Sequence, residues 1–157
     1  MKGKTNAMRI LDAEGLSYTD YAYNPKDGKI DGLSVAEKIG KEPEAVFKTL
    51  VAAGTSKQLY VFVIPVTADL DLKKAAKATG EKKIEMIPVK DIQKHTGYIR
   101  GGCSPIGMKK LYPTYLDSRT ISRENMIVSA GKIGRQIELN PSDLVAVTKA
   151  ITAHELI

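Results

Sequence analysis

The chain has 157 residues, 43% of them hydrophobic, and a net charge of +6 with a pI near 9.3. This length suits one domain spanning residues 1–157. The basic charge suggests an anionic partner, most commonly nucleic acid, although a merely soluble basic protein is also compatible with it. One cysteine excludes an intrachain disulfide, and two histidines leave no cluster with zinc-site spacing, so we expect neither a metal nor another cofactor.

No targeting or membrane segment is visible in the sequence. The first six residues lack the apolar core of a signal peptide, and no apolar run approaches the length of a membrane span. We therefore expect a cytoplasmic protein that does not contact a membrane.

Two short helices and a strand are predicted near the start of the chain. Thr5 can cap a helix that stops at Gly15, and the tyrosine-rich segment 16–23 favours a strand. A capping box over residues 34–37 opens a second helix, which ends at Gly40.

A strong hairpin follows, after another short helix that begins at Pro43. Its strands cover residues 48–53 and 59–66, and the segment 54–57 between them is a turn signal. The second strand is almost wholly apolar. We expect it to be a buried central strand, with Pro65 at its end.

The second half mixes short helices and strands. In chain order, the sequence predicts a helix over 71–79, a strand over 84–86, a helix from Pro88 toward Gly97, strands over 115–117, 126–129 and 136–139, and a last helix capped by Asn140. Strict alternation of strands and helices is missing. A mixed α/β barrel or sheet therefore fits better than a doubly wound fold.

The segment 96–107 is the strongest candidate for a binding loop, because it holds four glycines. They are Gly97, Gly101, Gly102 and Gly107. Consecutive glycines leave backbone amides uncovered, so these amides can point at an anion or a polarised carbonyl, and Arg100 adds a fixed cation beside them. The spacing matches neither the dinucleotide fingerprint nor a P-loop. A tight turn between two strands is the structural alternative.

Other reactive side chains give a weaker signal. Lys48 begins an otherwise apolar strand. Either its aliphatic chain extends so that the ammonium reaches water, or the ammonium binds a phosphate or a carbonyl. Cys103 lies in the glycine loop without a nearby histidine, which favours a role in the pocket wall over that of a nucleophile. His95 and His154 are read as surface residues, and no Ser-His-Asp set is legible.

Five motifs together resemble the YbaK/EbsC family. They are Phe-Lys-Thr-Leu at 47–50, Leu-Asp-Leu-Lys-Lys-Ala-Ala at 70–76, Thr-Gly-Tyr at 96–98, Gly-Gly-Cys-Ser-Pro-Ile-Gly at 101–107 and Val-Ser-Ala-Gly at 128–131. Members of this family are free-standing relatives of the editing domain inserted in some bacterial prolyl-tRNA synthetases. The resemblance implies a barrel-like β-sheet with peripheral helices.

The resemblance also implies roles for individual residues. Lys48 would sit at the tRNA 3′ end and the aminoacyl group, and Gly101 would offer its backbone to the substrate carbonyl or α-amino group. Tyr23 would line the pocket, with Tyr21 as the alternative register. The remaining substrate-binding residues expected from the motifs are Phe47, Thr49, Tyr98, Arg100, Gly102, Ser104, Pro105, Ser129 and Gly131.

The implied activity is hydrolysis of misacylated tRNA, chiefly cysteinyl-tRNA(Pro), in trans to prolyl-tRNA synthetase, which is a possible partner. In such a reaction the thiol of the substrate attacks its own ester, and the protein has to position the groups and stabilise the oxyanion. Two alternatives stay open. One is deacylation of another misacylated tRNA such as alanyl-tRNA(Pro), and the other is a non-catalytic module that binds tRNA or the synthetase.

Overall fold

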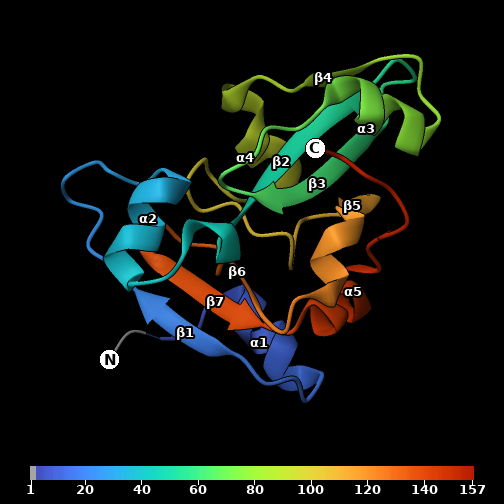
Figure 1. Ribbon diagram of the computed structural model, residues 1–157. Coiled ribbons are helices and arrows are strands. Elements are labelled where there is room, and N and C mark those ends of the chain that lie inside the picture. Colours follow the sequence, from blue (N-terminus) through green and yellow to red (C-terminus); the bar gives the residue numbers. More distant parts are fainter. Residues whose placement is uncertain (1–2) are drawn as a thin grey trace.

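The computed structural model describes residues 3–157, whose strands form two sheets (Figure 1). The three-stranded sheet has the order β1-β7-β6, and the four-stranded sheet has the order β4-β2-β3-β5. The strands are β1 (Thr19–Ala22), β2 (Phe47–Gly54), β3 (Leu59–Pro65), β4 (Ile84–Met86), β5 (Thr114–Leu116), β6 (Met126–Ser129) and β7 (Arg135–Leu139). All pairs are antiparallel except β3 with β5, so the larger sheet is mixed.

The helices are short, and most begin at a side-chain cap. They are α1 (Asn6–Ala13), α2 (Gly32–Ile39), α3 (Leu72–Thr79), α4 (Ile92–Thr96) and α5 (Pro141–Thr148), with 3₁₀ turns at Pro43–Ala45, Val89–Asp91 and Ser118–Ser122. Thr5, Asp71 and Asn140 accept hydrogen bonds from backbone N–H groups of the first turns of α1, α3 and α5.

One predicted cap is wrong. The sequence places a capping box at residues 34–37, whereas α2 begins two residues earlier, at Gly32. The carboxylate of Asp31 accepts hydrogen bonds from both the N–H and the hydroxyl of Ser34, at 3.2 and 2.7 Å. Because the Asp31 carboxylate accepts from the Ser34 N–H in the first turn, Asp31 is the cap and Ser34 lies inside the helix.

The core lies between the two sheets and is closed by α1 and α5. Phe47 and Val63 from the larger sheet pack with Val128 and Ile137 from the smaller one. A parallel bridge between Val46 and Ile127 joins the sheets. The predicted mixed α/β class with peripheral helices is confirmed, and the strands form two open sheets rather than one closed barrel.

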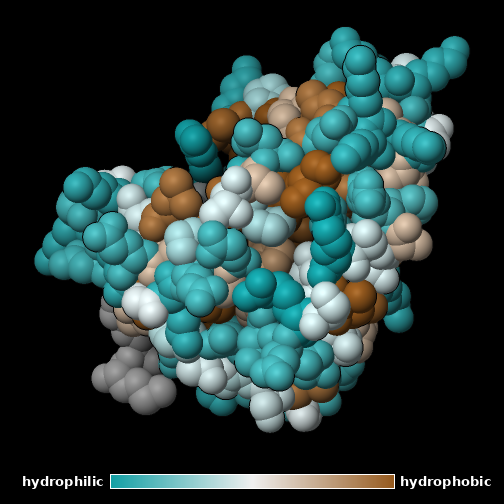
Figure 2. All heavy atoms as spheres, viewed as in Figure 1, coloured by the Kyte–Doolittle hydropathy of each residue, from teal (hydrophilic) through white to brown (hydrophobic). Residues whose placement is uncertain are grey.

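The hairpin of β2 and β3 was predicted well, because its inner strand is apolar on both faces. Phe62 and Ile64 on β3 are fully buried, and they pack in the cluster beneath α3. The predicted strand over 16–23 is shorter, since only Thr19–Ala22 pairs with β7. No helix among residues 3–157 is long and apolar enough to cross a membrane. The face in Figure 2 is mostly hydrophilic, with small separate hydrophobic patches.

Candidate functional site

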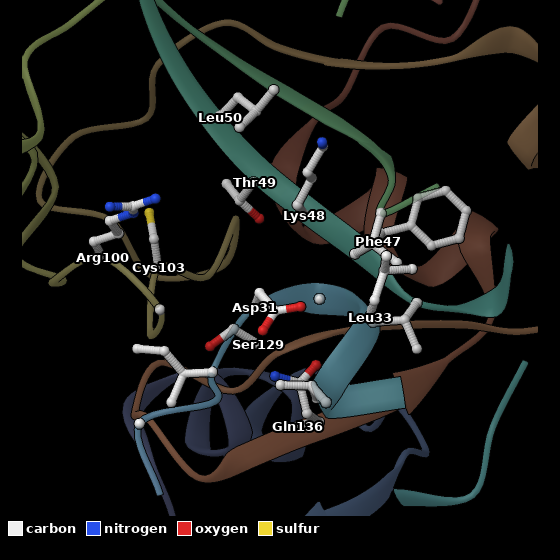
Figure 3. Close-up of a pocket in the computed structure, with 17 residues that line it drawn as sticks. Asp31, Leu33, Phe47, Lys48, Thr49, Leu50, Arg100, Cys103, Ser129 and Gln136 are labelled. Atoms are coloured by element: carbon white, nitrogen blue, oxygen red, sulfur yellow. The ribbon is translucent and has the colours of Figure 1, made fainter. Parts of the chain in front are cut away.

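A pocket of about 720 Å³ opens where α2, the first half of β2 and the glycine loop meet. Its walls come from parts of the segments 28–35, 46–50 and 100–103, together with Val66, Ser129 and Gln136. Residues far apart in the sequence are therefore brought together between the two sheets (Figure 3). Such a concave site with a few polar groups is a natural place for a small ligand.

Lys48 stands on the β2 wall of this pocket. It pairs across the hairpin with Ile64, and its side chain is 33% exposed. Its Nζ lies 3.8 Å from the carboxylate of Asp69, whose side chain is fully exposed. An ion pair with such an exposed partner is weak, so the ammonium remains available to an anionic or carbonyl group of a ligand.

Gly101 brings the glycine loop into the pocket. Its φ is +87°, a conformation that favours glycine, and a Cβ at this position would lie 2.7 Å from Cδ1 of Ile30. Within residues 3–157 no hydrogen bond is donated by the Gly101 N–H, whereas that of Gly102 donates to the carbonyl of Ile99 at 2.9 Å. The amide of Gly101 is thus a free donor of this turn, and Arg100 precedes it in the chain.

Six of the residues named from the sequence line the pocket, and six do not. Lining residues are Phe47, Lys48, Thr49, Arg100, Gly101 and Ser129, whereas Tyr23, Tyr98, Gly102, Ser104, Pro105 and Gly131 lie outside the lining.

Three of the residues outside the lining, Tyr98, Ser104 and Gly131, make contacts within the glycine loop or beside it. The Tyr98 hydroxyl donates to the carbonyl of Ile106, and a Cβ on Gly131 would lie 2.9 Å from the Tyr98 ring. Ser104 is fully buried and accepts a hydrogen bond from the Ile106 N–H. These contacts help to fix the shape of the loop.

Tyr23 is buried behind the pocket lining. Its ring lies 5.6 Å from Nζ of Lys38, which also donates to the carbonyls of Asn24 and Lys29. In the part of the chain that the structure describes, the buried Tyr23 hydroxyl has no hydrogen-bond partner. Together these contacts hold the loop that leads to α2.

Cys103 lines the pocket, and its surroundings favour the thiol form. Burial raises the pKa of Cys103 to about 11, so the sulfur is protonated near neutral pH. Within residues 3–157 neither histidine lines the pocket, and no group of three or more His, Cys, Asp or Glu side chains could hold a metal ion. The pocket can therefore position and polarise a carbonyl, but its own thiol is not activated.

Two polar residues of the pocket were missed from the sequence. Asp31 caps α2 and lines the pocket, and hydrogen bonds from the Ser34 hydroxyl and N–H lower the pKa of its carboxyl group. The Asp-Gly pair at 31–32 could have been read as a cap followed by a helix start. Gln136 lies in a predicted strand, but no alternation pattern there shows which of its side chains face a cavity.

A family model described as an aminoacyl-tRNA editing domain matches residues 33–147. The chain belongs to the aminoacyl-tRNA editing domain family. A relative from Enterococcus faecalis, named “Putative Cys-tRNA(Pro)/Cys-tRNA(Cys) deacylase EbsC”, is 49% identical over 145 residues, which cover 92% of this chain and 88% of the relative. The resemblance stated from the five motifs is thereby confirmed.

Solved structures share the fold of this editing domain. One, described as “a putative trans-editing enzyme for prolyl tRNA synthetase”, has a TM-score of 0.80 and 23% identity, and the match covers 98% of each chain. Another, described as hypothetical protein APE2540, has a TM-score of 0.85 and 21% identity, with 95% of this chain and 97% of the other covered. Both likenesses span nearly the whole editing domain.

Proposed function

We propose that this editing domain removes the amino acid from misacylated tRNA, chiefly cysteinyl-tRNA(Pro). The observation that carries the proposal is one pocket lined by both Lys48 and Gly101, whose N–H donates no hydrogen bond within residues 3–157. A cation and a free backbone amide are what an ester needs when negative charge develops on its carbonyl oxygen. The name of the 49% identical relative supports cysteine as the amino acid.

The substrate supplies the nucleophile in this proposal. The cysteinyl sulfur attacks the carbonyl carbon of its own ester, a C–S bond forms, and the C–O bond to the terminal ribose breaks. The thiol proton passes through water to the ribose oxygen, so tRNA leaves with its hydroxyl restored and a thiolactone remains for water to open. Lys48 and Gly101 hold the carbonyl while the pocket folds the side chain back toward it.

Cys103 is a wall residue in this mechanism. A thiol whose pKa is raised to about 11 has very little thiolate at neutral pH, and thiolate is the form that attacks esters. The thiol of the substrate enters a pocket bordered by Lys48 and Arg100. These cations favour ionisation of a substrate sulfur held in the pocket, whereas burial disfavours ionisation of Cys103.

The partner of this reaction is tRNA. We propose further that the protein works in the cytoplasm, in trans to prolyl-tRNA synthetase, and the solved structure described as a trans-editing enzyme for that synthetase supports this arrangement. The net charge of +6 suits binding to the phosphates of the acceptor stem.

The test is a deacylation assay with tRNA(Pro) charged with cysteine, alanine, serine or proline. We expect cysteinyl-tRNA(Pro) to be cleaved fastest by the wild-type protein. The Lys48→Ala variant should lose this activity, and Lys73→Ala, a change of an exposed lysine on α3, should retain it. Faster cleavage of alanyl-tRNA would favour the alternative substrate. Binding of tRNA without cleavage of any ester would overturn the proposal in favour of a non-catalytic module.

A further inference from the structure

Four oxygen-bearing side chains line the pocket, each from a different element. Thr49 comes from β2, Ser129 from β6, Gln136 from β7 and Asp31 from the cap of α2. We call them the acceptor floor. Ser129 and Gln136 are cross-strand partners, and Figure 3 shows the Asp31 carboxylate and the Thr49 hydroxyl on the side facing them.

Two oxygens of the acceptor floor have no hydrogen-bond partner among residues 3–157. Gln136 is only 5% exposed, and its Oε1 is buried without a hydrogen bond, as is Oγ1 of Thr49. Buried polar atoms in native proteins are nearly always hydrogen-bonded. Two orphans in the wall of one pocket therefore point to a ligand that brings the missing donor.

The acceptor floor has the chemistry to hold a cation. Asp31 carries a negative charge, and a carboxylate that accepts two hydrogen bonds from Ser34 keeps further lone pairs free. Ser129 accepts from the Gly131 N–H. By contrast, the Lys48 ammonium lies on the side of Thr49 away from Asp31, Ser129 and Gln136, with Arg100 on a neighbouring wall (Figure 3). The pocket is thus cationic where Lys48 and Arg100 lie and rich in acceptors at its floor.

An aminoacyl ester has the complementary polarity. The ester oxygens and the phosphate of the terminal nucleotide accept hydrogen bonds. The α-ammonium, which is two bonds from the carbonyl carbon of the ester, donates three. We propose that the acceptor floor binds the α-ammonium of the aminoacyl group, with Gln136 as its central acceptor, so that the domain requires a free amine on its substrate. This inference rests on the proposed deacylase function and adds to it a class of ester that is refused, namely one whose nitrogen is acylated.

The test compares cysteinyl-tRNA(Pro) with N-acetylcysteinyl-tRNA(Pro). Acetylation removes the ammonium but keeps both the thiol and the ester, so the reacting atoms are unchanged. Each enzymatic rate is divided by the uncatalysed rate of the same ester, because acylation alters the lability of the ester. We expect the wild-type protein to favour the free amine by about a hundredfold or more. An equal acceleration of both esters would overturn the inference and leave the deacylase proposal standing.

Variants assign the preference to the acceptor floor. Gln136→Leu should raise KM for the free-amine ester about tenfold to a hundredfold, the effect of losing one hydrogen bond to a charged group, and leave the slow N-acetyl reaction unchanged. Gln136→Glu keeps an acceptor and should retain the preference. Gln93→Leu on the exposed side of α4 is the matched control.

Protein stability separates binding from a structural role. Gln136→Leu removes an unpaired buried oxygen, so its resistance to denaturant should equal or exceed that of the wild type. A variant that loses stability and slows both esters equally would contradict the inference. Failure of the wild-type protein to cleave either ester would overturn the deacylase function, and the inference with it.

Discussion

Replacing Gly101 by alanine separates the backbone role of this residue from its role in ligand contact. The left-handed φ of +87° costs an alanine about 1–2 kcal/mol. The new Cβ would lie 2.7 Å from Cδ1 of Ile30, the flexible end of a side chain that can move aside. We therefore expect a loss of about 1–2 kcal/mol in unfolding free energy, with the fold intact. Proline would be a poorer test, because its φ near −65° cannot match this turn.

Alanine keeps the N–H but disfavours the φ that sets its direction, so kcat should fall by up to about a hundredfold to a thousandfold, the typical effect of losing one oxyanion donor. The control is Gly80→Ala at the end of α3. Its φ is +74° with no atom within 4 Å of the added Cβ, so the backbone cost is similar and the pocket is untouched. Denaturant unfolding and single-turnover deacylation are measured on both variants. A Gly101→Ala protein with wild-type kcat would refute the reasoning that the direction of this amide limits the reaction.

Three further predictions are tested by deacylation, by thiol labelling and by tRNA binding. Lys48→Ala should lower kcat/KM about a hundredfold or more while Lys73→Ala does not, and near wild-type turnover of Lys48→Ala would remove Lys48 from the mechanism. Because the pKa of Cys103 is raised from 9.0 to about 11, its thiolate fraction at pH 7.5 is about a hundredfold below that of an ordinary thiol. Its alkylation by iodoacetamide should be slower by a similar factor and speed up as the pH rises toward 11, and rapid labelling at pH 7.5 would contradict this. The logarithm of the tRNA-binding constant should fall linearly with the logarithm of the salt concentration. A binding constant that does not change with salt would exclude contacts to phosphates.

Most of the secondary structure could be predicted from local signals. The apolar run of β3 and the turn before it define the hairpin, and Asn140 with Pro141 marks the start of α5. These features depend on neighbouring residues only, so the sequence displays them directly. The 3₁₀ turn Ser118–Ser122 was not predicted, because its Asp117 cap is fixed through contacts with the distant Leu156.

The candidate site was predicted in part. Lys48 and Gly101 were found because a lysine on an apolar strand and adjacent glycines are unusual, and because they match family motifs. Asp31 and Gln136 were missed, since their place in the pocket depends on how α2 and β7 pack against β2. Tyr98 and Gly131 were predicted to bind substrate; they lie outside the pocket lining, and that role stays a prediction. A motif shows that a residue matters to the fold or the site, and only packing distinguishes the two.

The central claim is that the thiol of the substrate, and not a group of the protein, attacks the ester. The most direct measurement compares wild-type protein and Cys103→Ala on cysteinyl- and seryl-tRNA(Pro) under single-turnover conditions. We predict that Cys103→Ala retains most of its activity on the cysteinyl ester, and that both proteins cleave the seryl ester far more slowly, because a neutral hydroxyl is a much poorer nucleophile. Loss of activity in a folded Cys103→Ala variant, together with equal wild-type rates on the two esters, would contradict the account.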